Sequence, residues 1–269
     1  MATPLIEVSV PANAAGTPGT RRGEASPAPS SALRLQGVRF KYREGFAVQV
    51  PSFSLAPGEQ ALLTGPSGSG KSTLLHIIAG LVDVQAGKVE VAGVDMAGLR
   101  GARRDLHRGA HLGMIFQTFN LLQGFTAAEN VMAALMFSRV PRAEHRRRAE
   151  DLLMRLGLNA PGAPVERLSI GQQQRVAVAR AVACGPALVL ADEPTASLDP
   201  ENAAGAMALI QTACREAGAA LLCVSHDPSL AALFTRRERM ESIAMTSATA
   251  APSAPTQPRD SSGHAGSAA

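Results

Sequence analysis

One eight-residue segment carries the residue types that bind a polyphosphate. It follows the apolar run 61–63 and reads Gly65, Pro66, Ser67, Gly68, Ser69, Gly70, Lys71 and Ser72. Glycines let a backbone curl until successive N–H groups point at one anion. The N-terminus of a helix expected over residues 71–79 adds partial positive charge there. Lys71 can reach terminal phosphates, and the Ser72 hydroxyl can ligate Mg²⁺. The order of strand, loop, Gly-Lys-Ser and helix predicts a nucleotide site, including Thr73, and not an inert Gly/Ser-rich turn.

A second candidate for chemistry is the carboxylate pair Asp192-Glu193, which directly follows the apolar run 188–191. Ligands bind at the carboxyl edge of open α/β sheets, where such a strand ends. Asp192 is expected to hold Mg²⁺ through its water shell. Glu193 is expected to polarise the attacking water as a general base. Alone, the two acids could cap a helix or face solvent, but beside a phosphate loop they predict nucleotide hydrolysis.

The elements that must position these residues can be read from the apolar pattern. We expect strands at 33–40, 60–63, 88–91, 113–116, 187–191 and 220–224, and helices at 71–79, 146–156, 171–183 and 201–217. The runs 187–191 and 220–224 are apolar throughout, as in strands that are covered on both faces. Strands that alternate with helices indicate an α/β fold with a mainly parallel sheet.

Composition excludes several classes of protein. The chain has 269 residues, 46% of them hydrophobic, and a net charge of +4. Its arginines are scattered except for residues 146–148, which share a segment with apolar residues at helical spacing. We therefore expect the solvated face of an amphipathic helix there, not a nucleic-acid or lipid patch, and no nucleic-acid partner. The three cysteines lack metal-ligand spacing and are expected to be small core residues in a reducing compartment.

The ends of the chain differ from its middle. Residues 1–31 and 246–269 are rich in Ala, Pro, Ser and Gly and are predicted to be disordered tails around one folded unit, residues 32–245. No internal repeat is present. No apolar stretch reaches the roughly eighteen residues of a membrane span, so we expect a soluble, cytoplasmic protein.

The segment Leu168-Ser169-Ile170-Gly171-Gln172-Gln173-Gln174-Arg175 resembles the signature motif of ATP-binding cassette (ABC) proteins. Further motifs of this family stand before and after it, in the order typical of the family. Their residues here are Tyr42, Gln117, Ser197-Leu198-Asp199 and His226. The resemblance covers about residues 32 to 235. It implies a phosphate-loop NTPase core with a mainly parallel sheet, a small antiparallel β subdomain, and an inserted α-helical subdomain at about residues 118–172.

The resemblance also implies roles for these residues. Tyr42 would stack on adenine, Gln117 would sense Mg²⁺ and link to a membrane partner, and His226 would contact the terminal phosphate of ATP. From a second copy of the chain, Ser169, Gly171 and Gln172 would contact the same nucleotide, with Asp199 in the loop that crosses between subunits. ATP and Mg²⁺ are therefore the expected cofactors, and a homodimer is the expected assembly.

Two positions depart from the pattern of the family. Ile170 stands where the commonest signature has a second glycine, while Ser169 and Gly171 remain. Beyond His226, cassettes usually end in a glycine-containing hairpin, whereas residues 236–243 offer only a short charged and apolar stretch. The sequence leaves open whether an edge strand forms there.

The resemblance favours a transporter motor that drives a separately encoded integral membrane permease from the inner face of the membrane. Residues 116–122 and 126–131 look like the lipoprotein-release, macrolide-export and cell-division subgroup. The alternative is a non-transport cassette acting on DNA or ribosomes. The apolar segment after Gln117, with Phe119, Leu121, Leu122 and Phe125, is expected to dock the permease, with burial in the core as the competing interpretation.

Overall fold

The structure is a computed structural model that describes residues 31–42, 45, 47–138 and 140–247, without the side chains of Pro200 and Ser247. The predicted tails lie outside the described residues except for Ser31, Thr246 and Ser247. The last two belong to a strand.

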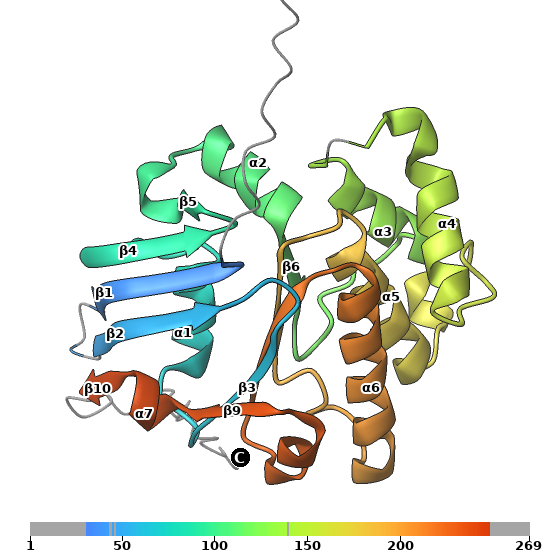
Figure 1. Cartoon of the computed structure of the whole chain (residues 1–269). Coiled ribbons are helices and arrows are strands. Elements are labelled where there is room, and N and C mark those ends of the chain that lie inside the picture. Colours follow the sequence, from blue (N-terminus) through green and yellow to red (C-terminus); the bar gives the residue numbers. More distant parts are fainter. Residues whose placement is uncertain (1–30, 43–44, 46, 139, 248–269) are drawn as a thin grey trace, which may run out of the picture.

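Two five-stranded sheets form the centre of the fold (Figure 1). The antiparallel sheet has the order β10 (Met245–Ser247), β2 (Ala47–Leu55), β1 (Leu33–Lys41), β4 (Ala86–Val91) and β5 (Val94–Asp95). The parallel sheet has the order β6 (Leu112–Ile115), β7 (Leu188–Asp192), β8 (Ala220–Ser225), β3 (Gln60–Thr64) and β9 (Arg236–Arg239). All six predicted strands form, and the predicted mainly parallel α/β sheet is confirmed.

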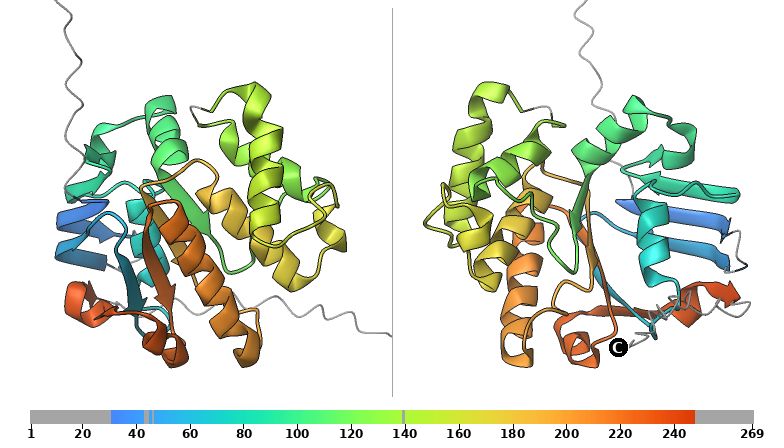
Figure 2. Two further views of the ribbon diagram at one scale, coloured as in Figure 1. Left: turned by 45° about the vertical axis from the view of Figure 1, so that its right-hand side comes forward. Right: turned by 180° about the vertical axis from the view of Figure 1, so that it is seen from behind.

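The α-helices are α1 (Lys71–Ile78), α2 (Ala102–His111), α3 (Ala127–Leu135), α4 (His145–Arg155), α5 (Ile170–Val182), α6 (Pro200–Glu216) and α7 (Met240–Ile243). Short 3₁₀ turns are η1 (Met96–Gly98), η2 (Arg142–Glu144), η3 (Val165–Arg167) and η4 (Pro228–Leu233). Helix α1 packs beside the antiparallel sheet, whereas α3, α4 and α5 gather on the opposite side of the parallel sheet (Figure 2). All four helices predicted from the sequence form at these places.

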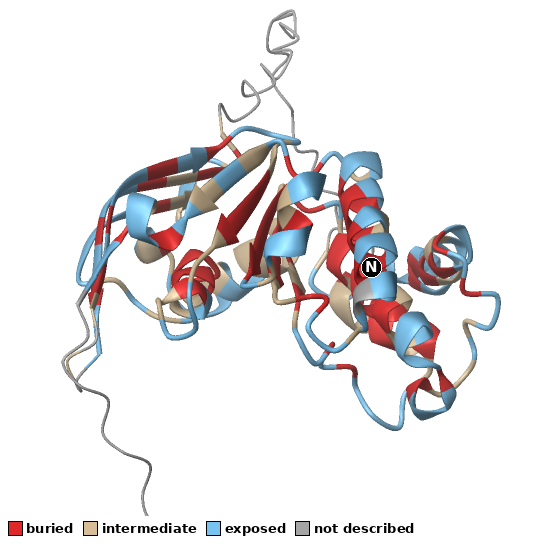
Figure 3. Ribbon diagram, turned by 90° about the horizontal axis from the view of Figure 1, so that it is seen from below, coloured by how far each residue is buried: buried red, intermediate tan, exposed pale blue. Residues whose placement is uncertain are grey.

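The parallel strands are buried on both faces, which explains their unbroken apolar runs. In β8, Leu221 and Cys223 belong to a core shared with α3 to α6, while Leu222 and Val224 belong to a core shared with α1 and the antiparallel sheet. Successive side chains of a strand point to opposite faces, so each run supplies both cores. The buried strands are visible between exposed outer surfaces in Figure 3.

Helix α5 lies very close to strand β6. A Cβ atom on Gly113 would lie 2.2 Å from the carbonyl oxygen of Ala181, so only glycine fits at that point of β6. This contact sets the helix that begins in the signature motif directly against the strand that leads to Gln117.

Helix α4 has the predicted amphipathic form. Its arginines Arg146, Arg147 and Arg148 are exposed, while Ala149 and Leu153 are fully buried against the neighbouring helices. The interpretation of the basic run as a solvated helix face is confirmed.

The stretch after His226 does form an edge strand. Strand β9 pairs in parallel with β3, and β10 then adds to the antiparallel sheet beside β2. Arg236 anchors β9 through ion pairs to Glu59 (2.9 Å) and Glu238 (3.1 Å) and lies over the ring of Phe53. Side-chain pairing therefore supports a strand that lacks an apolar pattern.

The cysteines are free and structural, as predicted. Cys214 and Cys223 are buried and Cys184 is half-buried. Burial raises the pKa of the Cys214 thiol to about 12 and also raises the pKa of Cys223, which makes both poor nucleophiles. Within the described part of the chain, no helix is both long and apolar enough to span a bilayer.

Candidate functional site

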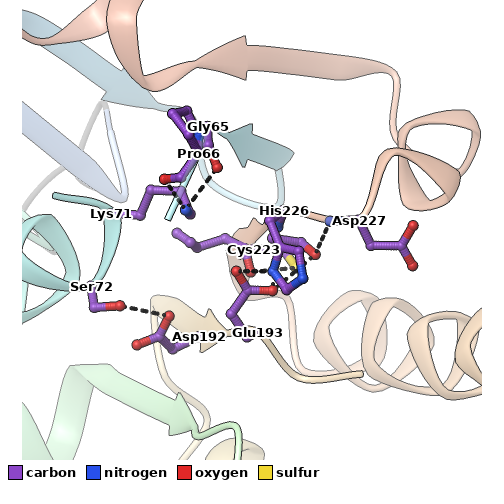
Figure 4. A network of polar contacts seen from close by, with 11 residues as sticks. Gly65, Pro66, Lys71, Ser72, Asp192, Glu193, Cys223, His226 and Asp227 are labelled. Carbon is purple, nitrogen blue, oxygen red and sulfur yellow. Dashed lines mark hydrogen bonds and ion pairs between the residues drawn. The ribbon is translucent and has the colours of Figure 1, made fainter. Parts of the chain in front are cut away.

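The predicted phosphate loop joins the carboxyl end of β3 to the first residue of α1. Gly68 (φ +77°) and Gly70 (φ +94°) adopt left-handed conformations that other residues rarely take, which curls the loop. Lys71 is buried, and its Nζ donates to the carbonyl oxygens of Gly65 (2.8 Å) and Pro66 (3.0 Å) (Figure 4). Its ammonium group is thus held within the curve of the loop.

The loop fits a phosphate group. The Ser69 Oγ is buried and has no hydrogen-bond partner among the described residues, which is costly for a hydroxyl unless a ligand oxygen meets it. The buried ammonium of Lys71 and the free N-terminus of α1 add positive charge at the same place. The residues present therefore suit a polyphosphate.

Two of the three predicted metal ligands, Ser72 and Asp192, lie together, whereas Gln117 is bonded to Ser197 through its carbonyl group. Ser72 Oγ donates to Asp192 Oδ1 over 3.1 Å, which links the start of α1 to the end of β7 (Figure 4). A hydroxyl and one carboxylate match Mg²⁺, which commonly takes one or two carboxylates together with substrate phosphates and water.

Glu193 has the most constrained position in the site. Its backbone is left-handed (φ +48°), a conformation that residues other than glycine adopt uncommonly. Oε1 lies 2.8 Å from Nδ1 of His226, and Oε2 accepts from Ser225 Oγ (3.1 Å) and from the backbone N–H of His226 (3.3 Å). The carboxylate is therefore fixed at the edge of the sheet, with the exposed imidazole of His226 facing it (Figure 4).

The Gln117 turn, residues 116–120, follows β6. The carbonyl oxygen of Gln117 accepts from Ser197 Oγ over 3.2 Å, and both side chains are exposed. The turn is thereby joined to the loop between Glu193 and α6. Asp199 in that loop caps α6 by accepting from the N–H of Asn202 (3.0 Å). Hydrogen bonds from Asn202 hold the pKa of the Asp199 carboxyl below its usual value.

The signature residues form the exposed N-terminus of α5. Ser169 caps this helix by accepting from the N–H of Gln172, whose side chain in turn accepts from the N–H of Ser169. Gly171 is exposed in the first turn. Ile170 also points to solvent, so it leaves the capping box intact. The departure from the common signature does not disturb the backbone of the motif.

The signature lies apart from the phosphate loop within one chain. Among the described residues, no hydrogen bond or ion pair joins Ser169, Gly171 or Gln172 to that loop. Tyr42 stands just after β1 with its ring partly exposed and in edge contact with Phe40 (centroids 4.6 Å apart). One chain thus brings together Lys71, Ser72, Asp192, Glu193 and His226, and leaves the signature facing outward.

One polar residue of the site, Ser225, was not predicted from the sequence, and it holds Glu193. Ser197 was named as part of the loop that crosses between subunits, but its bond to the Gln117 turn was not predicted. Ser225 directly precedes His226 at the end of a buried strand, and that position was an available signal.

The fold and the site define a phosphate-loop protein that binds and hydrolyses a nucleotide, and similarity to known proteins specifies the class further. The family model described as ABC transporter matches residues 48–196. The chain is 45% identical over 221 residues to the lipoprotein-releasing system ATP-binding protein LolD of Bordetella pertussis, covering 78% of this chain and 94% of the relative. It is 40% identical over 183 residues to the ABC transporter ATP-binding protein YtrE of Bacillus subtilis, covering 68% of this chain and 79% of that relative.

A solved structure agrees with these matches. The dimeric post-hydrolysis state of the ATP-binding cassette MJ0796, bound to ADP and Pi, superposes with a TM-score of 0.66 at 34% identity, covering 77% of this chain and 93% of that one. The chain belongs to the ABC transporter family. It is an ATP-binding, ATP-hydrolysing subunit of a transporter, and the predicted cassette fold and ATPase activity are confirmed. The comparisons give no support to the alternative of a cassette acting on DNA or ribosomes.

Proposed function

We propose that this chain hydrolyses Mg-ATP as one half of a homodimer and drives an integral membrane permease of the lipoprotein-release type. The observation that carries the proposal is the assembly of Lys71, Ser72, Asp192, Glu193 and His226 at one sheet edge, beside an orphaned Ser69 hydroxyl. The loop formed by Gly65, Pro66, Ser67, Gly68, Ser69 and Gly70 would bind the β- and γ-phosphates, Thr73 would continue their contacts, and Tyr42 would stack on adenine.

The metal ligands would be Ser72, Asp192 and Gln117. When bound, Mg²⁺ neutralises charge that develops on the phosphates during transfer. Glu193 takes a proton from the attacking water, since Ser225 and His226 fix its carboxylate at the edge of the sheet. His226, exposed beside Glu193, contacts the terminal phosphate. The fold already links Ser72 to Asp192 and Glu193 to His226.

The dimer completes the site. In one chain, the N-terminus of α5 faces outward with Ser169, Gly171 and Gln172 exposed. A helix N-terminus with its N–H groups directed at solvent suits the γ-phosphate of a nucleotide on a second copy. The dimeric structure of the cassette MJ0796 with ADP and Pi supports the dimer. ATP then joins the two copies, with Asp199 in the crossing loop, and hydrolysis allows them to separate.

A groove beside the Gln117 turn is the proposed docking site for the permease. It has a volume of about 380 Å³ and lies among α2, β6, α3 and α5. Its lining includes Phe116, Phe137 and Arg180. An apolar groove of this kind suits a short amphipathic helix of the membrane partner, and its place next to Gln117 would pass motion from the nucleotide to that helix.

The apolar segment after Gln117 divides between core and surface. Phe119 and Leu121 are buried, so the expectation that they dock the permease is wrong, and the core interpretation holds for both. Leu122 and Phe125 are exposed, together with Met136 and Phe137 on the C-terminal side of α3. Several large exposed apolar side chains on one subdomain favour a protein contact. We therefore propose two contacts with the permease, the groove that Phe137 lines and the exposed Leu122 and Phe125 just before α3.

Similarity to LolD favours a lipoprotein-releasing system, and the chain would then sit on the inner face of the membrane through its permease. A cassette of this kind supplies ATP-driven movement, while contacts with the transported molecule belong to the membrane subunits.

We expect Phe125→Asp to weaken co-purification with the neighbouring permease while basal ATPase and melting temperature stay nearly unchanged. Phe125 is 49% exposed, so an Asp there remains hydrated and costs the fold little. The measurements are thermal melting of the variant and its recovery with tagged permease from detergent-solubilised membranes.

The matched control is Met154→Asp. Met154 is 50% exposed on α4, outside the segment that follows Gln117, so this variant should keep both stability and co-purification. Unchanged recovery of Phe125→Asp with the permease, or a large loss of its melting temperature, would count against docking at this surface.

A further inference from the structure

Arg180 connects the signature helix to the Gln117 turn. It lies in the last turn of α5, the helix that Ser169 begins, and its guanidinium reaches the chain that follows β6. Nη1 donates to the carbonyl oxygen of Asn120 and Nη2 to that of Phe119, each over 2.6 Å. The planar guanidinium group thus holds two consecutive carbonyl groups, and we call these two bonds the Arg180 fork.

The two residues held by Arg180 have unfavourable backbone conformations. Phe119 (φ +59°) and Asn120 (φ +46°) are both left-handed, and the only other non-glycine residues of this kind among the described ones are Ala92 and Glu193. A left-handed conformation is costly for Phe, which is bulky, and it persists only where surrounding contacts impose it. The fork of Arg180 is such a contact.

Arg180 has no acidic partner that would explain its position. Among the described residues, no carboxylate lies within ion-pair distance of its guanidinium. Burial lowers the pKa of the Arg180 side chain. A half-buried cation that bonds only backbone carbonyls is expensive to keep. Its position is therefore explained by the two carbonyl groups that it holds.

The Gln117 turn is bonded to two other parts of the site. Its carbonyl at Gln117 is bonded to Ser197, in the loop that follows Glu193. Its other end, at Phe119 and Asn120, is bonded to α5, whose first turn is the signature. Arg180 also lines the groove beside this turn. A movement of residues 119 and 120 relative to the end of α5 must strain or break the two bonds from Arg180.

We propose that Arg180 is a positioning residue that holds the Gln117 turn in its left-handed form and couples that turn to the signature helix. It acts through Gln117 and touches no reacting atom. The inference deepens the proposed function, since it rests on Gln117 serving the nucleotide site. It predicts that loss of the fork loosens the turn in every state of the protein, including the nucleotide-free state.

The first test is backbone hydrogen exchange of residues 116–121 in the nucleotide-free, full-length chain. Arg180→Met keeps the aliphatic stem and removes both donors, and we expect exchange in that segment to rise by about tenfold or more. Arg180→Lys can reach one carbonyl only and should give an intermediate rise, which keeps the test informative if the Met variant fails to fold. Exchange that matches the unmodified chain in the folded variants would overturn the proposal.

The second test is a double-mutant cycle on kcat. We expect Arg180→Met and Gln117→Ala each to lower kcat on the order of tenfold, the scale of a misplaced group, and to lower it no further when combined. Arg148 provides the control, because its Nε donates over 3.0 Å to the carbonyl oxygen of Ala183, the C-cap of α5, and not to the Gln117 turn. The effects of Arg148→Met and Gln117→Ala on kcat should multiply when the two substitutions are combined.

The outcomes distinguish the role of Arg180 from the role of Gln117. If Arg180→Met and Gln117→Ala multiply as independent factors, Arg180 does not act through Gln117 and the proposal fails. If Gln117→Ala alone leaves kcat unchanged, the proposed role of Gln117 fails, and the hydrogen-exchange result still decides whether Arg180 holds the turn.

Discussion

Glu193→Gln is expected to bind ATP with nearly unchanged affinity and to hydrolyse it roughly 10²–10⁴ times more slowly, the usual effect of losing a positioned base. The amide keeps the size of the side chain and can still meet Ser225 and His226, which hold the carboxylate in the structure. It cannot accept a proton from water at neutral pH. Binding should therefore survive while chemistry is lost.

Steady-state turnover and equilibrium binding of ATP test this expectation together. Glu216→Gln is the matched control, because Glu216 is exposed at the end of α6 and outside the site, so its rate should stay normal. Near-normal hydrolysis by purified Glu193→Gln would remove Glu193 as the general base.

The second large effect is expected from mixing two inactive variants. Lys71→Ala and Ser169→Ala should each lower hydrolysis roughly 10²–10³-fold, as when one charge-stabilising donor is lost. If the two groups act on one ATP from different copies, half of the dimers in an equal mixture are mixed, and each has one intact site of two. The mixture should then recover about one quarter of normal activity in a two-fold symmetric assembly.

A separate control is needed because Ser169 also caps α5. Loss of a cap costs about 1 kcal/mol of stability, and this could lower the rate by itself. Ser169→Asp keeps a capping oxygen and places negative charge toward the phosphate, so it should melt normally and still be inactive. No recovery in the mixture, or full activity of Ser169→Ala alone, would contradict a site shared between copies.

The parallel core could be predicted because its signals are local. Strands such as β8 are apolar on both faces, and the phosphate loop and the acid pair follow such strands directly. The carboxyl ends of the parallel strands meet at one sheet edge, so residues that directly follow different strands become neighbours in space. Lys71, Asp192 and Glu193 were therefore identifiable without coordinates.

Other elements depend on distant partners. Strand β2 was not predicted, since Pro51 interrupts its pattern, yet it pairs with β1 on both sides of that residue. Strand β9 is made of four charged residues and forms because β3 offers a free edge and Glu59 meets Arg236. Apolar and polar residues alternate on each side of Pro51 in β2, so part of that strand was readable, whereas no sequence pattern marks β9.

Helix α3 was not predicted, although its start carries a local signal. Its start carries a capping box, with Thr126 and Glu129 satisfying each other's backbone N–H groups, and the Thr-x-x-Glu spacing was readable. The same neighbourhood also led to a wrong interpretation. Phe119 lies in the core because left-handed residues turn the chain inward, and no periodicity in the sequence predicts that turn.

Within the site, the supporting residues were the hardest to find. Ser225 and Arg180 act by bonding groups far away in the chain, so their importance becomes visible only when the fold brings those groups together. Residue types at fixed spacing identify groups that would touch the nucleotide. The residues that hold them in place need coordinates.

Sedimentation velocity of Glu193→Gln with and without ATP tests most directly whether the nucleotide joins two copies of the chain. The variant should be monomeric without nucleotide and dimeric in saturating ATP, because hydrolysis no longer releases the two copies. Adding Lys71→Ala to the same chain should keep it monomeric in ATP. A Glu193→Gln chain that binds one ATP and remains a monomer at every protein concentration would contradict the composite site.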